Sequence, residues 1–577
     1  MKLIHISVDS LHTGGMLYSS VTPGLCVAPP RLRAVWNGDG MTSTTPASAG
    51  HHTEGPATIG DVPGAPAAAR AERLVRRVVG GADSAPVQMR APFTGQPIAT
   101  LPQATDADVR AVFDQAREAQ RAWAERPVED RQRILIRLHD LVLKRQEEAL
   151  DLVQIEAGKA RMDAFDEVSA TALVAAYYGK HSAKILSPRR AAGLIPVLTK
   201  VGEIRHPKGV VGIISPWNYP LALTAMDVLP ALAAGNTVVQ KPDNQTALSA
   251  LWLQEVAEEA GLPAGVWQIV LGRGSQIGDA LVEESDYLCF TGSTPTGKGL
   301  AAKVAERLTS YSLELGGKNP MIVLPDADIA KTAAGAVTAC FSSAGQLCVS
   351  VERIYVHESI REEFTRAFVA KTAALRLGGA LDYQAQMGSL TSEAQLETVS
   401  AHVEDARSKG AKVLTGGKAR PDLGPLFYEP TVLTDVTEDV KLFAEETFGP
   451  VVSIYGYTDV TDAIERANDT KFGLNASVWS RNGRAGWEVA ARLKAGTVNV
   501  NEGFAATFGT VGLPMGGMKE SGVGRRNGAE GLLKYTEAQA IAVQRGMPLR
   551  PGRGIPPKLW ARGLSAGLKA LRRLPRR

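Results

Sequence analysis

Two patterns of apolar and polar positions divide the chain into regions. Between Asp106 and Lys184, apolar residues recur at spacings of three and four, which indicates helices with one buried face, and three helices fit this length. After residue 207, short apolar runs alternate with helical stretches. The predicted strands are 210–214, 237–240, 266–270, 287–290 and 311–315, and the helical stretches include 246–260 and 294–308. This alternation predicts a doubly wound parallel α/β sheet that binds ligands at the carboxyl ends of its strands.

A second alternating region runs from Pro320 to about Asn501 and predicts another α/β domain. We therefore expect the functional site in the cleft between the two domains. Residues 1–85 are rich in Gly, Pro, Ala, Ser and Thr and lack a sustained apolar period, so we predict a disordered extension there. Met41 begins a run that is typical of a protein start, and we hypothesise that translation begins at this residue.

Composition narrows the class of protein. Hydrophobic residues make up 44% and charged residues 21% of the chain, as in ordinary globular proteins. The four cysteines form no C-x-x-C pair and the histidines form no cluster, so we predict neither a disulfide framework nor a metal site. Free cysteines suit a reducing compartment, and we therefore predict a cytoplasmic location. The most apolar stretch, 221–239, is interrupted by polar residues, which argues against a membrane span.

The basic charge of the chain belongs to its C-terminal tail. The net charge is +4, but ten Lys or Arg and no acidic residue follow Glu537, and removing those ten charges leaves −6. A nucleic-acid partner is therefore not supported.

In the tail, an apolar stripe lies at helical spacing opposite cations. The stripe is Trp560, Leu564, Leu568 and Leu571, and the cations are Arg562, Lys569, Arg572 and Arg573. Such a helix can lie on anionic lipid, but a solvated or oligomer-packing tail is the alternative.

Cys348 is a candidate nucleophile, because a thiolate attacks carbonyl carbon readily. All nine histidines lie outside the Gly-rich motifs around it, so the candidate base is a carboxylate, Glu314 in the run ELGGK. Asn218 lies in the loop SPWNYP directly after a predicted strand, where its amide can donate to a developing oxyanion. Such a donor contributes roughly 3 kcal/mol to a reaction of this kind. Each of these residues taken alone is as readily a structural one.

Three further motifs have the character of a nucleotide site. Lys241 and Asp243 follow a predicted strand at the position where doubly wound folds receive a ribose. The run FTGSTPTG, with Gly292 and Ser293, leads from a strand into a helix, where free N–H groups suit a diphosphate. Farther along, the run EETFGP offers a carboxylate for ribose hydroxyls and an aromatic ring for a nicotinamide; these two residues are Glu446 and Phe448.

Together these motifs resemble the aldehyde dehydrogenase superfamily from about residue 88 to 540. Further matching runs are GSL at 388–390, YEPT at 428–431, GLNASV at 473–478, GTVNVN at 496–501, PMGG at 514–517, SG at 521–522 and KYTE at 534–537. The resemblance implies that Cys348 attacks an aldehyde, Asn218 stabilises the oxyanion, and Glu314 activates the water that hydrolyses the thioester. It also implies that NADP or NAD is held by Pro216, Trp217, Lys241, Asp243, Asn244, Gly292, Ser293, Leu315, Glu446 and Phe448.

The resemblance implies a division of the chain as well. The expected parts are a cofactor domain (86–184 and 207–316), a catalytic domain (317–519), a small β oligomerisation arm (185–206 and 520–540) and a basic amphipathic tail (541–577). The arm implies a homodimer or homotetramer.

The alternative function from another class is a cofactor-independent thiol esterase. Cys348, Asn218 and Glu314 would suffice for ester hydrolysis, but this function leaves the cofactor-type motifs without a role.

Cofactor and substrate choice rest on single positions. Members that prefer NAD commonly carry Glu three residues after the ribose-binding Lys, and here Asn244 removes that repulsion against a 2′-phosphate, although Asp243 places a carboxylate nearby. NADP is therefore our hypothesis.

Long runs resemble a bacterial succinate-semialdehyde dehydrogenase branch. However, Ser342 and Met226 stand where that branch carries arginines for the substrate carboxylate, which leaves less polar aliphatic or aromatic aldehydes as the alternative substrates.

Overall fold

The computed structural model describes residues 65–78, 84–192, 199–545 and 550–572. Its first large group of elements is helical, with α2 (Asp106–Glu125), α3 (Val128–Lys144), α4 (Gln146–Ala157) and α5 (Arg161–Leu186). Three helices were predicted over this region and four are present. The break between α3 and α4 lies at Arg145, and the sequence carries no Gly or Pro there to signal it. The end of α4 is conventional, because Gly158 adopts the left-handed conformation at φ +76°.

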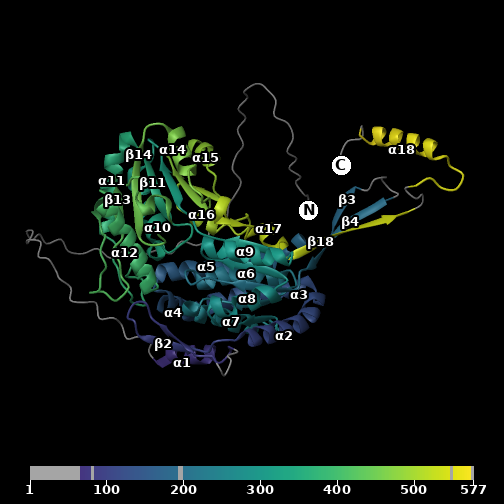
Figure 1. Ribbon diagram of the computed structural model, residues 1–577, viewed down its shortest axis with the longest axis horizontal. Coiled ribbons are helices and arrows are strands. Elements are labelled where there is room, and N and C mark those ends of the chain that lie inside the picture. The colour runs from purple at the N-terminus through teal and green to yellow at the C-terminus, as the bar shows by residue number, and fades with distance from the viewer. Residues whose placement is uncertain (1–64, 79–83, 193–198, 546–549, 573–577) are drawn as a thin grey trace, which may run out of the picture. The chain divides into compact units, whose positions relative to one another are not determined.

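A six-stranded sheet follows, and its order β17-β9-β8-β5-β6-β7 is that of a doubly wound fold. Its strands are β5 (Val210–Ile214), β6 (Thr237–Lys241), β7 (Trp267–Ile269), β8 (Tyr287–Thr291), β9 (Ser310–Glu314) and β17 (Gly522–Val523). All neighbours are parallel except β17, which pairs antiparallel with β9. The connecting helices are α6 (Pro220–Ala233), α7 (Ala247–Glu259), α8 (Gly274–Glu284) and α9 (Thr294–Glu306), with α2 beside α8 (Figure 1).

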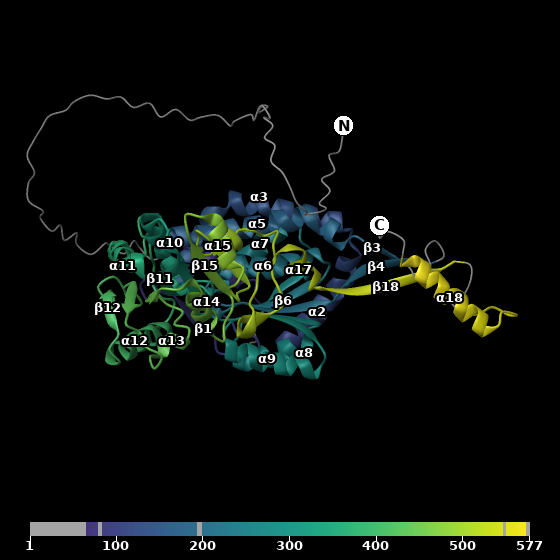
Figure 2. The same ribbon diagram turned by 90° about the horizontal axis from the view of Figure 1, so that it is seen from above.

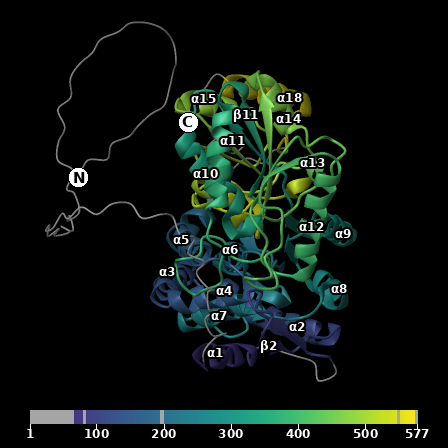
Figure 3. The ribbon, with the colours of Figure 1, turned by 90° about the vertical axis from the view of Figure 1, so that its left-hand side faces the viewer.

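A seven-stranded sheet forms the second α/β region, in the order β12-β13-β14-β11-β10-β15-β16. Its strands are β10 (Asn319–Val323), β11 (Val351–His357), β12 (Lys412–Thr415), β13 (Thr431–Thr434), β14 (Val451–Tyr457), β15 (Asn475–Trp479) and β16 (Thr497–Val500). Its helices are α10 (Ile329–Phe341), α11 (Glu358–Ala373), α12 (Glu393–Ser408), α13 (Lys441–Ala444), α14 (Val460–Asn468), α15 (Gly483–Ala490) and α16 (Ala505–Phe508). Figure 3 shows α10 and α11 beside β11. The predicted fold class, two doubly wound α/β regions, is confirmed.

A separate three-stranded antiparallel sheet corresponds to the expected arm. It consists of β3 (Arg189–Ala192), β4 (Thr199–Pro207) and β18 (Thr536–Gln544), in the order β18-β4-β3 (Figure 2). The expected segment 520–540 is divided between two places. Its first part contains β17, in the six-stranded sheet, and α17 (Gly528–Leu533), which packs against α5 and α6. The arm strand begins only at Thr536 and extends to Gln544, four residues beyond the expected end.

The N-terminal region contains a packed helix where disorder was expected. Helix α1 (Ala65–Val75) buries Leu74 and Ala71 in the largest apolar cluster of the protein. The prediction of a disordered extension over 1–85 is therefore wrong for 65–78, while 1–64, with the proposed start at Met41, and 79–83 lie outside the described residues. The sequence did not reveal α1 because the helix is short and flanked by Gly, Pro and Ala. The hairpin of β1 (Val87–Arg90) and β2 (Pro97–Leu101) follows it.

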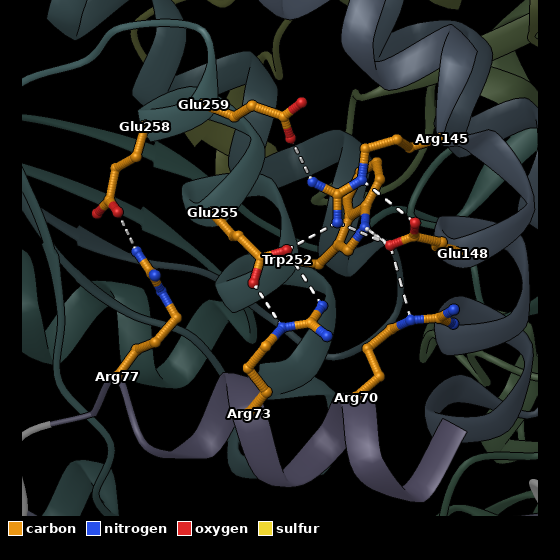
Figure 4. A network of polar contacts seen from close by, with 9 residues as sticks. All are labelled: Arg70, Arg73, Arg77, Arg145, Glu148, Trp252, Glu255, Glu258 and Glu259. Atoms are coloured by element: carbon orange, nitrogen blue, oxygen red, sulfur yellow. Dashed lines mark hydrogen bonds and ion pairs between the residues drawn. The ribbon is translucent and has the colours of Figure 1, made fainter. Parts of the chain in front are cut away.

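Ion pairs join α1 and the turn after it to neighbouring helices (Figure 4). Arg73 donates to Glu255 of α7 at 3.1 Å, and Arg77 pairs with Glu258 one turn farther along. Arg70 lies 3.6 Å from Glu148 of α4, and Arg145 joins Glu148 to Glu255. Trp252 also donates its indole N–H to Glu148 at 3.1 Å. These contacts orient α1, whereas the burial of Leu74 supplies most of its stability, because partly exposed ion pairs contribute little.

The basic tail contains one further helix, α18 (Pro557–Leu571). Among the described residues, no helix is both long enough and apolar enough to cross a membrane.

Replacing Leu74 should show that α1 belongs to the folded unit. Leu74→Ala removes a fully buried side chain, and we expect the free energy of unfolding to fall by about 2–4 kcal/mol. Urea unfolding followed by tryptophan fluorescence measures it. Arg76→Ala is the matched control, since Arg76 is exposed directly after the end of this helix, and it should change stability by less than about 0.5 kcal/mol. A Leu74→Ala protein as stable as the Arg76→Ala protein would refute the packing of α1.

Candidate active site

A strained turn presents Cys348. After α10 ends at Phe341, three consecutive residues adopt left-handed backbone angles: Ser343 at φ +53°, Ala344 at +55° and Gly345 at +70°. This conformation is costly for residues other than glycine and persists only where the surroundings impose it. At Gly345 no other residue fits, because a Cβ would lie 2.1 Å from the carbonyl oxygen of Gly449.

Hydrogen bonds from both α/β regions hold the turn. The Ser343 N–H donates to Asp163 Oδ2 of α5 at 2.9 Å, and the hydroxyls of Ser343 and Tyr219 lie 2.9 Å apart. On the far side of Cys348, Asn319 Nδ2 donates to the Cys348 carbonyl at 2.8 Å. The position of the Cys348 backbone is therefore fixed on both sides of the thiol.

Cys348 opens into a pocket of about 280 Å³. The pocket is lined by Pro216, Trp217, Asn218, Thr291, Gly292, Ser293, Glu314, Leu315, Gly316, Cys348, Gln395, Glu446 and Phe448. Most of these follow the carboxyl ends of β5, β8 and β9, where a doubly wound sheet binds its ligands. All three predicted catalytic residues and seven of the ten predicted cofactor residues are thus together. Thr291, Gly316 and Gln395 also line the pocket but were not singled out from the sequence.

Glu314 ends β9 with its carboxyl group 4% exposed, and in the described part of the chain its Oε1 has no hydrogen-bond partner. Burial raises the pKa of Glu314 to about 7, and the cations Arg526 and Lys534 offset part of this effect. A carboxyl group with a pKa near 7 and a free oxygen can both accept and release a proton at neutral pH, as a general base must.

Behind Glu314 lies a buried ionic cluster that the sequence analysis missed. Arg526 is 1% exposed and donates from Nε to Asp227 Oδ1 at 2.9 Å, while Lys534 Nζ lies 3.4 Å from the same oxygen. Arg526 also donates to Thr291, a pocket residue. The available signal was Asp227 itself, because an aspartate inside the apolar run 221–239 needs a buried cation as its partner.

The Cys348 thiol is partly exposed to the pocket. Burial, followed by the charge of Glu314, raises the pKa of Cys348 to about 12. The thiol is therefore protonated at neutral pH in this arrangement, and it needs a base before it can act as a nucleophile. Two carboxyl groups line the same pocket, Glu314 and Glu446. Glu446 accepts from the Gly317 N–H, whereas Oε1 of Glu314 has no hydrogen-bond partner among the described residues.

Asn218 follows β5 and is 5% exposed. Its Nδ2 donates to the carbonyl of Gln346 at 3.0 Å, which ties the amide to the turn that carries Cys348. An amide nitrogen has two N–H groups, so the second remains for a ligand in the pocket. This geometry suits an oxyanion donor.

The rest of the pocket wall suits a nicotinamide and a diphosphate. The rings of Trp217 and Phe448 meet edge to face, with centroids 5.6 Å apart. Ser293 precedes α9 without a side-chain cap, which leaves the first N–H groups of this helix available to an anion. Glu446 Oε1 accepts from the Gly317 N–H at 2.7 Å, and burial raises the pKa of Glu446 to about 8.

Lys241, Asp243 and Asn244 lie at the end of β6, outside the lining of this pocket. Lys241 donates to the Pro242 carbonyl at 3.1 Å, and burial lowers its pKa. Asp243 caps a short turn by accepting from the Gln245 N–H. Asn244 donates to Gln103, but its buried Oδ1 lacks a partner among the described residues. Such an unpaired oxygen at the end of a strand is consistent with a dinucleotide that continues from the pocket along the strand ends.

A second buried pair supports the Phe448 loop. Lys318 and Glu352 form an ion pair at 2.5 Å, and Glu352 accepts from the N–H groups of Thr447 and Phe448. Gln395 donates to the carbonyl of Phe448 at 2.8 Å. These bonds hold Phe448 in a left-handed conformation, at φ +53°. Little in the sequence points to Glu352, because the strand Val351–His357 also carries Arg353 and His357.

Among the described residues, no group of three or more His, Cys, Asp or Glu is placed to hold a metal ion.

Comparison with known proteins agrees with this geometry. The family model described as "Aldehyde dehydrogenase family" matches residues 79–541. A protein of Mycobacterium ulcerans, provisionally named an NADP(+) succinate-semialdehyde dehydrogenase, is 54% identical over 485 residues, which cover 84% of this chain and 94% of that protein. The mitochondrial succinate-semialdehyde dehydrogenase of Oryza sativa is 37% identical, with 80% of this chain and 87% of that protein covered.

A solved structure shares the fold. Betaine aldehyde dehydrogenase of Staphylococcus aureus, in complex with NAD+, matches with a TM-score of 0.79 and 31% identity, over 83% of this chain and 98% of that chain. The resemblance inferred from the motifs is thereby confirmed, since the family model spans most of the protein. The chain belongs to the aldehyde dehydrogenase family.

Proposed function

We propose that this chain oxidises an aldehyde to a carboxylic acid with Cys348 as nucleophile, Glu314 as general base and Asn218 as oxyanion donor. The observation that carries the proposal is that these three side chains line one pocket beside the wall suited to a nicotinamide. Membership of the aldehyde dehydrogenase family means oxidation of aldehydes with NAD(P)+, which also argues against the esterase alternative.

In the proposed sequence, Glu314 accepts the proton of Cys348 as the sulfur bonds to the aldehyde carbon. The Asn218 amide and the Cys348 backbone N–H stabilise the oxygen, which becomes negative. The bound nicotinamide supplies a hydride acceptor, so the carbonyl re-forms as a thioester on Cys348. Glu314, after losing its proton to solvent, then takes a proton from the water that attacks the thioester, and the acid leaves as the thiol is restored.

We infer that NADP+ is the preferred cofactor. Asn244 carries no charge at the position that follows Lys241 by three residues, so it does not repel a 2′-phosphate. Asp243 is the opposing carboxylate, but it is engaged as a cap. The M. ulcerans relative is also named for NADP(+).

Succinate semialdehyde is the first candidate substrate, since relatives that are 54% and 37% identical carry this name. A specific observation favours a second candidate, an uncharged aldehyde. Met226 is buried in the same apolar cluster against which Cys348 packs, and Ser342 lies next to the turn. Neither residue can pair with a carboxylate as an arginine would, a contact worth roughly 1.5–3 kcal/mol.

We further propose a homodimer or homotetramer that assembles through the arm. Strand β18 is the edge of its sheet and leaves Ile541 and Val543 more than 40% exposed. An edge strand with exposed apolar side chains can pair with another copy.

We also propose that the protein resides in the cytoplasm, because Cys289, Cys340 and Cys348 are all free thiols.

Glu314→Gln should abolish the proposed base while keeping the shape of the side chain. We expect kcat to fall at least 100-fold, measured as NADPH formation at 340 nm. In the wild type, kcat should rise with pH and level off above about 7, because the pKa of Glu314 is raised and only its carboxylate accepts protons. Glu306→Gln changes an exposed acid at the end of α9 and should keep full activity. A Glu314→Gln enzyme with normal kcat would refute the assignment.

Cofactor choice is tested at Asn244. Wild-type kcat/KM should be higher with NADP+ than with NAD+, and Asn244→Glu should lower the NADP+ to NAD+ ratio at least tenfold by charge repulsion. Asn244→Gln has nearly the same size as Glu without its charge, and it should leave the ratio close to that of the wild type. A wild-type preference for NAD+ would show that Asp243 decides the specificity instead.

Substrate choice is tested at Ser342. The wild type should oxidise succinate semialdehyde, and Ser342→Arg should raise kcat/KM for it by about tenfold or more, because the arginine adds a charge-assisted hydrogen bond. The value for butanal, an uncharged aldehyde of similar length, should stay unchanged. If the wild type instead favours butanal by more than tenfold, the uncharged aldehydes are the true substrate class.

A further inference from the structure

The last part of the chain differs in charge from everything before it. From residue 538 to the end there are ten Lys or Arg and no Asp or Glu, whereas the preceding residues carry net charge −6. After β18 ends at Gln544, the helix described within this part is α18 (Pro557–Leu571). A helix in so uniformly basic a segment has no acidic neighbours in sequence with which to pair.

The two faces of α18 are sharply different. At about 100° per residue, Trp560, Leu564 and Leu568 fall within an arc of about 80°, and the sequence continues this stripe at Leu571. On the opposite side of the helix lie Lys558, Arg562 and Lys569. The stripe and these cations thus lie on different faces of the helix, and Leu559 lies off the stripe.

Neither face is satisfied within the described chain. Leu568 is 45% exposed, Trp560 and Leu564 are partly exposed, and no hydrogen bond or ion pair joins α18 to any other described element. Other surface helices pair their cations with carboxylates one turn away, as Arg466 does with Asp462 in α14 and Arg484 with Glu488 in α15. In α18 the cations have no such carboxylate, so they are available to an external anion.

We propose that α18 lies flat on the surface of an anionic lipid bilayer. The stripe of Trp560, Leu564 and Leu568 enters the boundary of the acyl chains, and Lys558, Arg562 and Lys569 meet the phosphates of the headgroups. A bilayer interface presents apolar and anionic chemistry side by side over any length, and therefore suits both faces at once. A second copy of this chain that covered the stripe would leave these cations, which lie on the opposite face of the helix, turned away from that contact.

The dimensions of α18 agree with a position on the membrane rather than across it. Its 15 residues span roughly 22 Å, while a crossing helix needs about 20 apolar residues. The proposal concerns where the protein resides and does not depend on the assignment of Cys348 or on the identity of the aldehyde.

Vesicle co-sedimentation of the full chain tests the proposal. We expect the wild type to bind vesicles of phosphatidylcholine with 30% phosphatidylglycerol at least tenfold more strongly than vesicles of phosphatidylcholine alone. In 1 M salt, where charges are screened within about 3 Å, binding to the anionic vesicles should fall at least tenfold. No binding, or equal binding to both kinds of vesicle, would overturn the proposal.

Two variants distinguish vesicle binding through the apolar stripe from non-specific adsorption. Leu564→Ser with Leu568→Ser should reduce binding to the anionic vesicles at least tenfold, because it removes the centre of the stripe. Leu559→Ser is the matched control: Leu559 is 63% exposed on the same helix but lies off the stripe, so binding should stay within about twofold of the wild type. Both proteins should retain wild-type aldehyde oxidation, which shows that they are folded. Equal binding by the double variant and the wild type would overturn the proposal.

Light scattering without lipid tests whether a second copy of the chain, rather than lipid, covers α18. The wild type and the double variant should have the same assembly mass, that of a dimer or tetramer joined through the arm. A lower mass for the double variant, together with no vesicle binding by the wild type, would mean that α18 covers a second copy of the chain, and the membrane proposal would fail. A monomeric wild type would contradict the assembly proposed for the arm.

Discussion

The site depends on the turn at residues 343–345. Three consecutive left-handed residues are costly, and their conformation is imposed by contacts that reach outside the seven-stranded region. Asp163 and Tyr219, from the helices that pack with the six-stranded sheet, bind Ser343, and Asn218 binds the Gln346 carbonyl. The same bonds that join the two regions therefore also place Cys348 opposite Glu314. Disturbing the interface between the regions would displace the nucleophile before it unfolded either sheet.

The electrostatics of the pocket follow from burial more than from pairing. Burial raises the pKa of both Cys348 and Glu314, and the charge of Glu314 further disfavours ionisation of Cys348. The site therefore holds a neutral thiol at neutral pH, and in the proposed mechanism Glu314 takes the proton of that thiol. The buried cluster of Asp227, Arg526 and Lys534 limits this effect, since its cations keep the pKa of Glu314 near 7 rather than higher. Glu314 can then serve both thiol attack and thioester hydrolysis near neutral pH.

The sequence predicted those parts of the fold and site that depend on local pattern. The strand predicted at 210–214 is present with the same bounds, and the motif residues at strand ends meet in one pocket because parallel strands share a carboxyl edge. What it missed depends on contacts between distant residues. Nothing near Arg526 or Glu352 in the sequence indicates their partners at Asp227 and Lys318, which lie far away along the chain. The packing of α1 was missed for the same reason, since its few apolar residues gain their burial from β2 and α7.

The central claim is that Cys348 carries the acyl group and Glu314 releases it. The most direct measurement is mass spectrometry of the Glu314→Gln protein after incubation with NADP+ and succinate semialdehyde or butanal, followed by proteolysis. We predict an acyl adduct on the peptide that contains Cys348, because the thioester forms slowly without the base and then cannot be hydrolysed. An adduct on Cys289 or Cys340 instead, or an active protein that never carries an adduct on Cys348, would contradict the account.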